Sequence, residues 1–141
     1  MKEKITIYTS ETCHYCKQTK EFLKESEIDY VEKNIVNFKK EWEEVVDLLG
    51  TNMLPTILFK NNYYAPGRDY NSPQDLLNNL ENITSKTKRS TERQILERLK
   101  TLNYGIHLAF RNVDSILKGL ENTVNLLNQK KEEENEHEST S

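Results

Sequence analysis

The spacing of apolar and polar residues predicts an α/β arrangement over the first 84 residues. Short runs of β-branched and aromatic residues indicate strands, whereas apolar residues spaced by three and four indicate helices. The predicted order is strand, helix, strand, helix, strand, strand, helix, at residues 4–8, 16–26, 29–35, 38–49, 54–59, 63–64 and from 73 onward. Gly50 is suited to end the second helix, and Ser72 followed by Pro73 is suited to begin the last one.

The last third of the chain follows a different pattern, a seven-residue repeat over residues 91–129. Nine of ten positions in two columns are apolar: Leu99, Ile106, Val113, Leu120 and Leu127 in one column, and Ile95, Leu102, Ala109, Ile116 and Thr123 in the other. Such a repeat is typical of coiled-coil helices. It favours a homo-oligomer formed through residues 91–129 over the alternative, a helical hairpin that breaks near residues 103–105.

Composition and charge divide the chain into three regions. Residues 1–84 carry 10 Lys or Arg and 14 Asp or Glu, residues 85–130 carry 9 and 4, and residues 131–141 carry 1 and 5. Residues 82–91 are polar and poor in helix formers, which is typical of a linker. We therefore expect a domain at 1–84, a linker and oligomerisation helix at 85–130, and a disordered acidic tail at 131–141. The basic charge of the middle region is interpreted as a solvated helix face, and nucleic acid is not an expected partner.

Two cysteines, Cys13 and Cys16, stand between the first predicted strand and the first predicted helix, and the chain has no others. A Cys-x-x-Cys pair in this setting is typical of a redox site. The alternatives are a buried structural pair or half of a zinc site. Zinc sites normally use four nitrogen or sulfur ligands, and no further cysteine is present, so we expect no metal site here. A cysteine pair in one redox motif, without a signal peptide or a membrane-spanning apolar run, predicts a cytoplasmic protein with no membrane partner.

The position of the pair predicts a different role for each cysteine. Cys13 stands where the free N–H groups and dipole of a helix start favour a thiolate, with a pKa in the range of roughly 3.5–7.5 for such motifs. It is therefore the predicted nucleophile, and Cys16, about one turn later, is the predicted resolving cysteine. Lys17 adds positive charge nearby. His14 is either a solvated turn residue or, when charged, a group that favours the thiolate and makes the couple more oxidising.

Several stretches together resemble the glutaredoxins, a branch of the thioredoxin fold. They are Ile7–Thr9, Cys13–Cys16, Glu27–Tyr30 and Leu54–Thr56. The resemblance implies an α/β fold with a four-stranded mixed sheet flanked by helices, to which a long C-terminal helix is added here. The sequence departs from the family at His14, where glutaredoxins often have proline, and at residues 65–69, where the family has a Gly-Gly-x-Asp-Asp stretch.

The same resemblance implies which residues contact glutathione. Pro55 corresponds to a cis proline that faces the active-site cysteine. The backbone of Leu54 corresponds to the backbone that binds the cysteinyl part of glutathione. Tyr15 is implied to lie beside glutathione. Within the altered stretch, Asp69 is expected to bind the amino group of glutathione, and Arg68 is expected to bind one of its carboxylates.

These features lead to one main functional hypothesis and two alternatives. The main hypothesis is a glutathione-dependent thiol–disulfide oxidoreductase that reduces protein disulfides or glutathione mixed disulfides and is presented on a homo-oligomer. One alternative is a redoxin recycled by thioredoxin reductase that serves ribonucleotide reductase. The other is not an enzyme: a [2Fe–2S] carrier, in which each of two subunits supplies one cysteine and one glutathione, or a redox-responsive scaffold.

Overall fold

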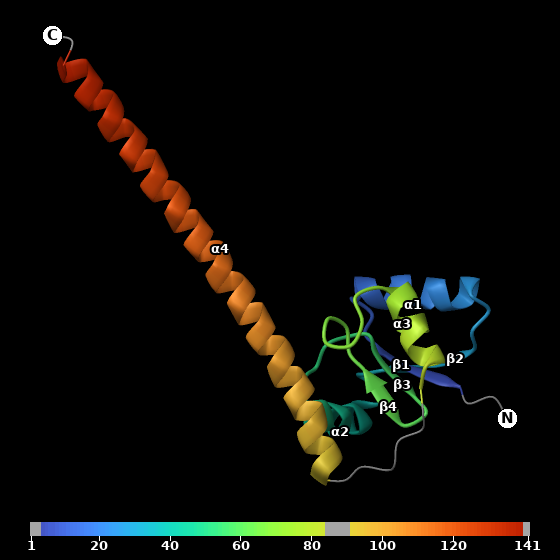
Figure 1. Ribbon diagram of the computed structural model, residues 1–141. Coiled ribbons are helices and arrows are strands. Elements are labelled where there is room, and N and C mark those ends of the chain that lie inside the picture. Colours follow the sequence, from blue (N-terminus) through green and yellow to red (C-terminus); the bar gives the residue numbers. More distant parts are fainter. Residues whose placement is uncertain (1–3, 84–90, 140–141) are drawn as a thin grey trace. The chain divides into compact units, whose positions relative to one another are not determined.

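The computed structural model describes residues 4–83 and 91–139 and contains the predicted elements in the predicted order (Figure 1). The strands are β1 (Ile5–Thr9), β2 (Tyr30–Asn34), β3 (Thr56–Phe59) and β4 (Asn62–Tyr64). The helices are α1 (His14–Glu25), α2 (Lys39–Leu49), α3 (Pro73–Glu81) and α4 (Thr91–Ser139). Helix α1 begins two residues earlier than predicted because the side chain of Cys13 accepts a hydrogen bond from the backbone N–H of Cys16 and so caps the helix.

The four strands form one mixed sheet in the order β2-β1-β3-β4. Strand β1 pairs in parallel with β2 and antiparallel with β3, and β3 pairs antiparallel with β4. This arrangement confirms the four-stranded mixed sheet that was expected. Since β1 is an inner strand, the chain that leaves its carboxyl end at Thr9 is anchored on both sides just before it reaches the cysteines.

Apolar side chains pack on both faces of this sheet. On one face, Ile7 and Ile57 pack with Leu23 of α1 and with Leu76 of α3. The second cluster contains Tyr8, Trp42, Val45, Leu48 and Leu49, of which all but Tyr8 belong to α2. Neighbouring residues of β1 enter different clusters because successive strand side chains point to opposite faces. Helices α1 and α3 therefore cover one face of the sheet and α2 covers the other.

Helix α4 runs unbroken from Thr91 to Ser139, and the hairpin alternative is therefore wrong. The contacts between residues divide the molecule into two compact units, Met1–Tyr104 and Gly105–Ser141, and the boundary between them falls within this helix. The first turns of α4 thus belong to the same compact unit as the sheet, so the expected end of that domain at residue 84 is too early. Most of the predicted linker, residues 84–90, lies outside the described residues.

The acidic end of the chain is helical as far as Ser139, so the expected disorder of residues 131–141 is wrong for 131–139. Glu, Lys and Gln dominate this stretch, and their unbranched side chains are good helix formers. The high charge that suggested disorder is thus compatible with continuation of an existing helix. Within residues 4–83 and 91–139, none of the helices combines the length and apolar character needed to cross a membrane.

Candidate functional site

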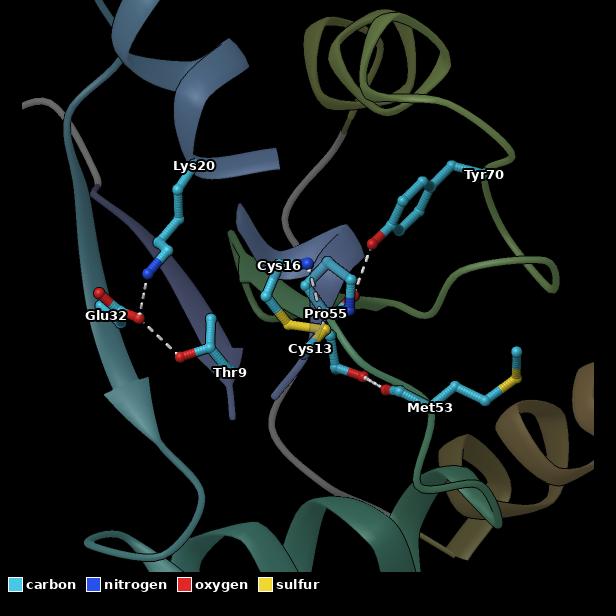
Figure 2. Close-up of a disulfide and its surroundings, with 9 residues drawn as sticks. Thr9, Cys13, Cys16, Lys20, Glu32, Met53, Pro55 and Tyr70 are labelled. Carbon is cyan, nitrogen blue, oxygen red and sulfur yellow. Dashed lines mark hydrogen bonds and ion pairs between the residues drawn. A yellow bond between two sulfur atoms is a disulfide. The ribbon is translucent and has the colours of Figure 1, made fainter. Parts of the chain in front are cut away.

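The two cysteines lie at the start of α1 and are joined by a disulfide (Figure 2). Their Cα atoms are 5.2 Å apart. Cys13 is the N-cap residue, and its Sγ accepts a hydrogen bond of 3.1 Å from the backbone N–H of Cys16. Cys13 is half-buried, whereas Cys16 is only 1% exposed. The reduced Cys13 sulfur would therefore be accessible and would lie where helix-start N–H groups stabilise a thiolate.

Exposed side chains of the first turns of α1 lie next to the cysteines in the sequence. Tyr15, between the cysteines, is 67% exposed, and its ring meets that of His14 edge-on at 6.4 Å between centroids. An imidazole nitrogen of His14 lies 3.2 Å from the side-chain amide of Gln18, and Lys17 is exposed. In the part of the chain that the structure describes, no three His, Cys, Asp or Glu side chains gather so as to hold a metal ion.

The loop before β3 lies beside the disulfide, with Pro55 directed toward it (Figure 2). The peptide bond between Leu54 and Pro55 is cis, as the family resemblance implies. Two hydrogen bonds hold this loop: the Tyr70 hydroxyl donates to the carbonyl oxygen of Pro55 at 2.5 Å, and the Thr56 hydroxyl donates to that of Met53 at 2.6 Å. Burial, and after it the Asp69 carboxylate, raise the pKa of Tyr70, so its phenol stays protonated and remains a donor.

A charged cluster lies on the side of the disulfide opposite Met53 and Tyr70 in Figure 2. Glu32 of β2 accepts hydrogen bonds from Lys20 of α1 at 2.8 Å and from the hydroxyl of Thr9, which ends β1, at 2.7 Å. These bonds, Lys20 first and Thr9 second, lower the pKa of Glu32. The cluster thereby ties together the three elements that position the cysteines. Sequence reasoning missed Thr9 and Glu32 because the cluster forms only when separate elements come together.

A cleft of about 360 Å³ opens next to the cysteines. We call it the neutral cleft. It is lined by Tyr15, Gln18, Thr19, Met53, Leu54, Pro55, Pro66, Gly67, Tyr70, Asn71, Ser72, Pro73 and Tyr104. The cleft thus brings together Tyr15, Leu54 and Pro55, three of the five residues expected to contact glutathione. All the lining residues identified within 4–83 and 91–139 are uncharged.

Arg68 and Asp69, the other two expected glutathione contacts, are engaged within the protein. The Arg68 side chain is 1% exposed and forms ion pairs with Asp69 at 2.6 Å and with Glu97 of α4 at 2.8 Å. Asp69 also accepts a hydrogen bond of 2.8 Å from the backbone N–H of Ala65. The guanidinium of Arg68, which was expected to bind a carboxylate of glutathione, is therefore already paired with the carboxylate of Glu97 in α4.

Comparisons with known proteins relate this chain to one family. Residues 5–64 match the profile of the glutaredoxin family. The chain is 41% identical over 58 residues to the uncharacterized glutaredoxin-like 8.6 kDa protein in the rubredoxin operon of Clostridium pasteurianum, over 41% of this chain and 77% of that protein. It is also 38% identical over 45 residues to the global transcriptional regulator Spx 2 of Bacillus cereus, over 32% of this chain and 34% of that regulator.

A solved structure of another protein resembles part of this chain. A crystal structure of a mutant thioredoxin-like protein superimposes with a TM-score of 0.46 and 23% identity, over 56% of this chain and all of the other. Sheet topology, the Cys-x-x-Cys pair at the start of α1 and the cis proline beside it agree with the family match. The chain belongs to the glutaredoxin family, with a thioredoxin-like fold that is extended by the long helix α4.

Proposed function

We propose that the protein is a thiol–disulfide oxidoreductase that reduces protein disulfides and glutathione mixed disulfides. The observation that carries this proposal is the unequal exposure of the cysteine pair, with Cys13 accessible at the start of α1 and Cys16 buried one turn later. An accessible sulfur at a helix start is suited to attack a substrate disulfide. A buried neighbouring sulfur is suited to attack the resulting mixed disulfide.

In the proposed reaction, the Cys13 thiolate attacks one sulfur of the substrate disulfide. A bond forms between Cys13 and that sulfur, the substrate S–S bond breaks, and the released thiolate takes a proton. The Cys16 thiolate then attacks Cys13, so that the second substrate sulfur leaves as a thiolate and the Cys13–Cys16 disulfide forms. Two electrons and two protons pass to the substrate. Two glutathione thiols return the pair to the dithiol and become glutathione disulfide.

We also propose that glutathione approaches through the neutral cleft. The cysteinyl part would lie against Leu54 and Pro55, and Tyr15 would border it, because all three line the cleft next to the disulfide. Lys17 and His14 are exposed in the same turn of α1 and are assigned a modulating role, Lys17 through its positive charge and His14 when it is charged. Arg68 and Asp69 would contact glutathione only after the contact between Arg68 and Glu97 opens.

Turnover in a coupled assay tests the proposal. Wild-type protein should reduce the mixed disulfide of glutathione and 2-hydroxyethanethiol when glutathione, glutathione reductase and NADPH are supplied, and NADPH absorbance should fall. A second reaction with thioredoxin reductase in place of glutathione identifies the reductant. Turnover in the second reaction alone would mean that thioredoxin reductase, and not glutathione, is the reductant of this protein. Turnover in neither reaction would contradict the proposed activity.

We further propose that α4 pairs with α4 of a second copy of the chain. In Gly105–Ser141, apolar side chains are 38–69% exposed: Ile106, Leu108, Phe110, Val113, Ile116, Leu117, Leu120, Val124, Leu126 and Leu127. So large an apolar surface on one helix is typical of a protein–protein contact. The seven-residue spacing of Ile106, Val113, Leu120 and Leu127 matches a seam between like helices.

Replacing seam residues with lysine should dissociate the oligomer. Ile116→Lys combined with Leu120→Lys removes apolar contacts of about 2 kcal/mol each, so the dissociation constant should rise at least ~100-fold. Light scattering of the full chain over a range of concentrations measures this change. The control, Ser115→Lys with Asn122→Lys, adds the same charge outside the two apolar columns and should remain assembled. A wild-type chain that is monomeric at every concentration would contradict the pairing.

A further inference from the structure

Helix α4 contributes a residue to the neutral cleft. Tyr104 lines the cleft together with Tyr15 and Pro55, which lie next to the disulfide. It stands outside residues 5–64, which match the family profile, and beyond the sheet and helices α1 to α3. The appended helix therefore supplies part of the surface that a substrate meets at the cysteines.

A buried ion pair and a partly buried hydrogen bond bring Tyr104 to this place. Glu97 is 1% exposed and pairs with Arg68, and the hydroxyl of Thr101 donates to the carbonyl oxygen of Leu49 at 2.6 Å. Glu97, Thr101 and Tyr104 follow one another at spacings of four and three, so they lie on one face of the helix. The face that anchors α4 to the domain is thus the face that carries Tyr104.

The ring of Tyr104 lies directly against the backbone of Gly67. A methyl group at Gly67 would stand 2.8 Å from the ring carbon that bears the hydroxyl, closer than two such atoms approach. Gly67 also has a φ of +79°, a conformation that favours glycine. The absence of a side chain at this position makes room for the ring at the edge of the cleft.

The surroundings of Tyr104 are unsuited to charged side chains of a substrate peptide. Arg68 is held by Glu97 and Asp69, and the lining identified among the described residues is uncharged. The start of α3 is capped from within, since Ser72 accepts from the N–H of Asp75 and the Asp75 carboxylate accepts from that of Asn71. A substrate carboxylate placed beside the Tyr104 ring would lose water without gaining a cationic partner from the lining, which is costly. The proposed position of glutathione avoids this cost, because only its cysteinyl part enters the cleft and its carboxylates stay in water.

We propose that Tyr104 is a specificity-determining residue that contacts the peptide around a substrate disulfide and favours apolar or aromatic neighbours of the cysteine over acidic ones. Tyr15, Tyr70 and Tyr104 surround the cleft with rings, and aromatic pairs add about 0.5–1.5 kcal/mol beyond the area they bury. This proposal rests on the proposed oxidoreductase activity and names the class of protein substrate for it.

Two synthetic peptides, each closed by one disulfide, test the proposal. They differ only in the residue before the first cysteine, which is phenylalanine in one and glutamate in the other. Wild-type protein should reduce the phenylalanine peptide with about 10-fold higher kcat/KM. Tyr104→Ala should remove most of this preference by raising KM for the phenylalanine peptide, whereas the reduction potential of the cysteine pair should not change. Tyr104→Phe should keep the preference.

Tyr104→Lys should reverse the preference toward the glutamate peptide, a gain that loss of folding cannot produce. Asn103→Lys adds the same charge at the exposed neighbouring position and should leave the preference as in wild type. An unchanged preference in both Tyr104→Ala and Tyr104→Lys would overturn the inference while leaving the oxidoreductase activity intact. Failure of the wild type to reduce either peptide or the small mixed disulfide would instead contradict the proposed activity itself.

Discussion

Cys13→Ser is expected to abolish disulfide reduction, whereas Cys16→Ser is expected to keep part of the activity toward glutathione mixed disulfides. Cys13 is the accessible sulfur at the start of α1, and a hydroxyl there stays protonated and does not attack. Loss of a nucleophile costs on the order of 10⁴-fold or more in rate. The coupled assay with glutathione reductase measures the loss.

The partial activity of Cys16→Ser follows from the exposure of the two positions. Once Cys13 has taken up glutathione as a mixed disulfide, a second glutathione from solution can attack it, because Cys13 is only half-buried. Protein disulfides need Cys16 to release them and should be reduced far more slowly. Thr12→Ala, next to the pair on the exposed side, is the control and should keep both activities. A Cys13→Ser variant with more than about a tenth of wild-type turnover would contradict these roles.

Local features of this chain were predictable because their signals lie close together in the sequence. The strand before Cys13, the Ser72 cap of α3 and the Gly50 end of α2 each depend on neighbouring residues, and the structure has all three. The cis peptide before Pro55 was also expected, from the family resemblance rather than from spacing. Only the ends of the elements shifted, by one or two residues in most cases, where capping decides them.

The features that the sequence did not indicate concern residues whose partners lie far away in the sequence. Arg68 was assigned to glutathione from its place in the altered family stretch, but its partner Glu97 is 29 residues further on and reaches it only when α4 packs on the domain. Tyr104 stood at the proposed hairpin break, so the sequence pattern drew attention to a turn rather than to the cleft. The acidic tail was judged by charge, and the helix propensity of its Glu and Lys residues was overlooked.

Arg68→Met is expected to destabilise the domain by about 3–5 kcal/mol, because it removes the guanidinium that lies between the buried carboxylates of Asp69 and Glu97. The Glu97 side chain is 2% exposed and that of Asp69 is 14% exposed, so water does not readily replace the guanidinium. Urea unfolding at one fixed protein concentration measures the loss, since any assembly through α4 makes stability depend on concentration. Lys118→Met provides the control. Its ion pair with Asp114, at 2.9 Å, is exposed on both sides, so the change should cost less than ~0.5 kcal/mol.

A double variant separates the charge of this pair from its packing. Replacing both partners, Arg68→Met with Glu97→Met, removes the buried charge on α4 together with the cation and should recover much of the stability lost in Arg68→Met alone. A cost of less than about 1 kcal/mol for Arg68→Met would contradict this account, because it would mean that water or Lys100, which lies 3.4 Å from Glu97, replaces the guanidinium. Because Glu97 and Tyr104 share one face of α4, the same variants should also weaken the peptide preference that depends on Tyr104. Loss of stability with an unchanged preference would mean that the other contacts of α4 with the domain, among them the bond of Thr101 to Leu49, hold Tyr104 at the cleft.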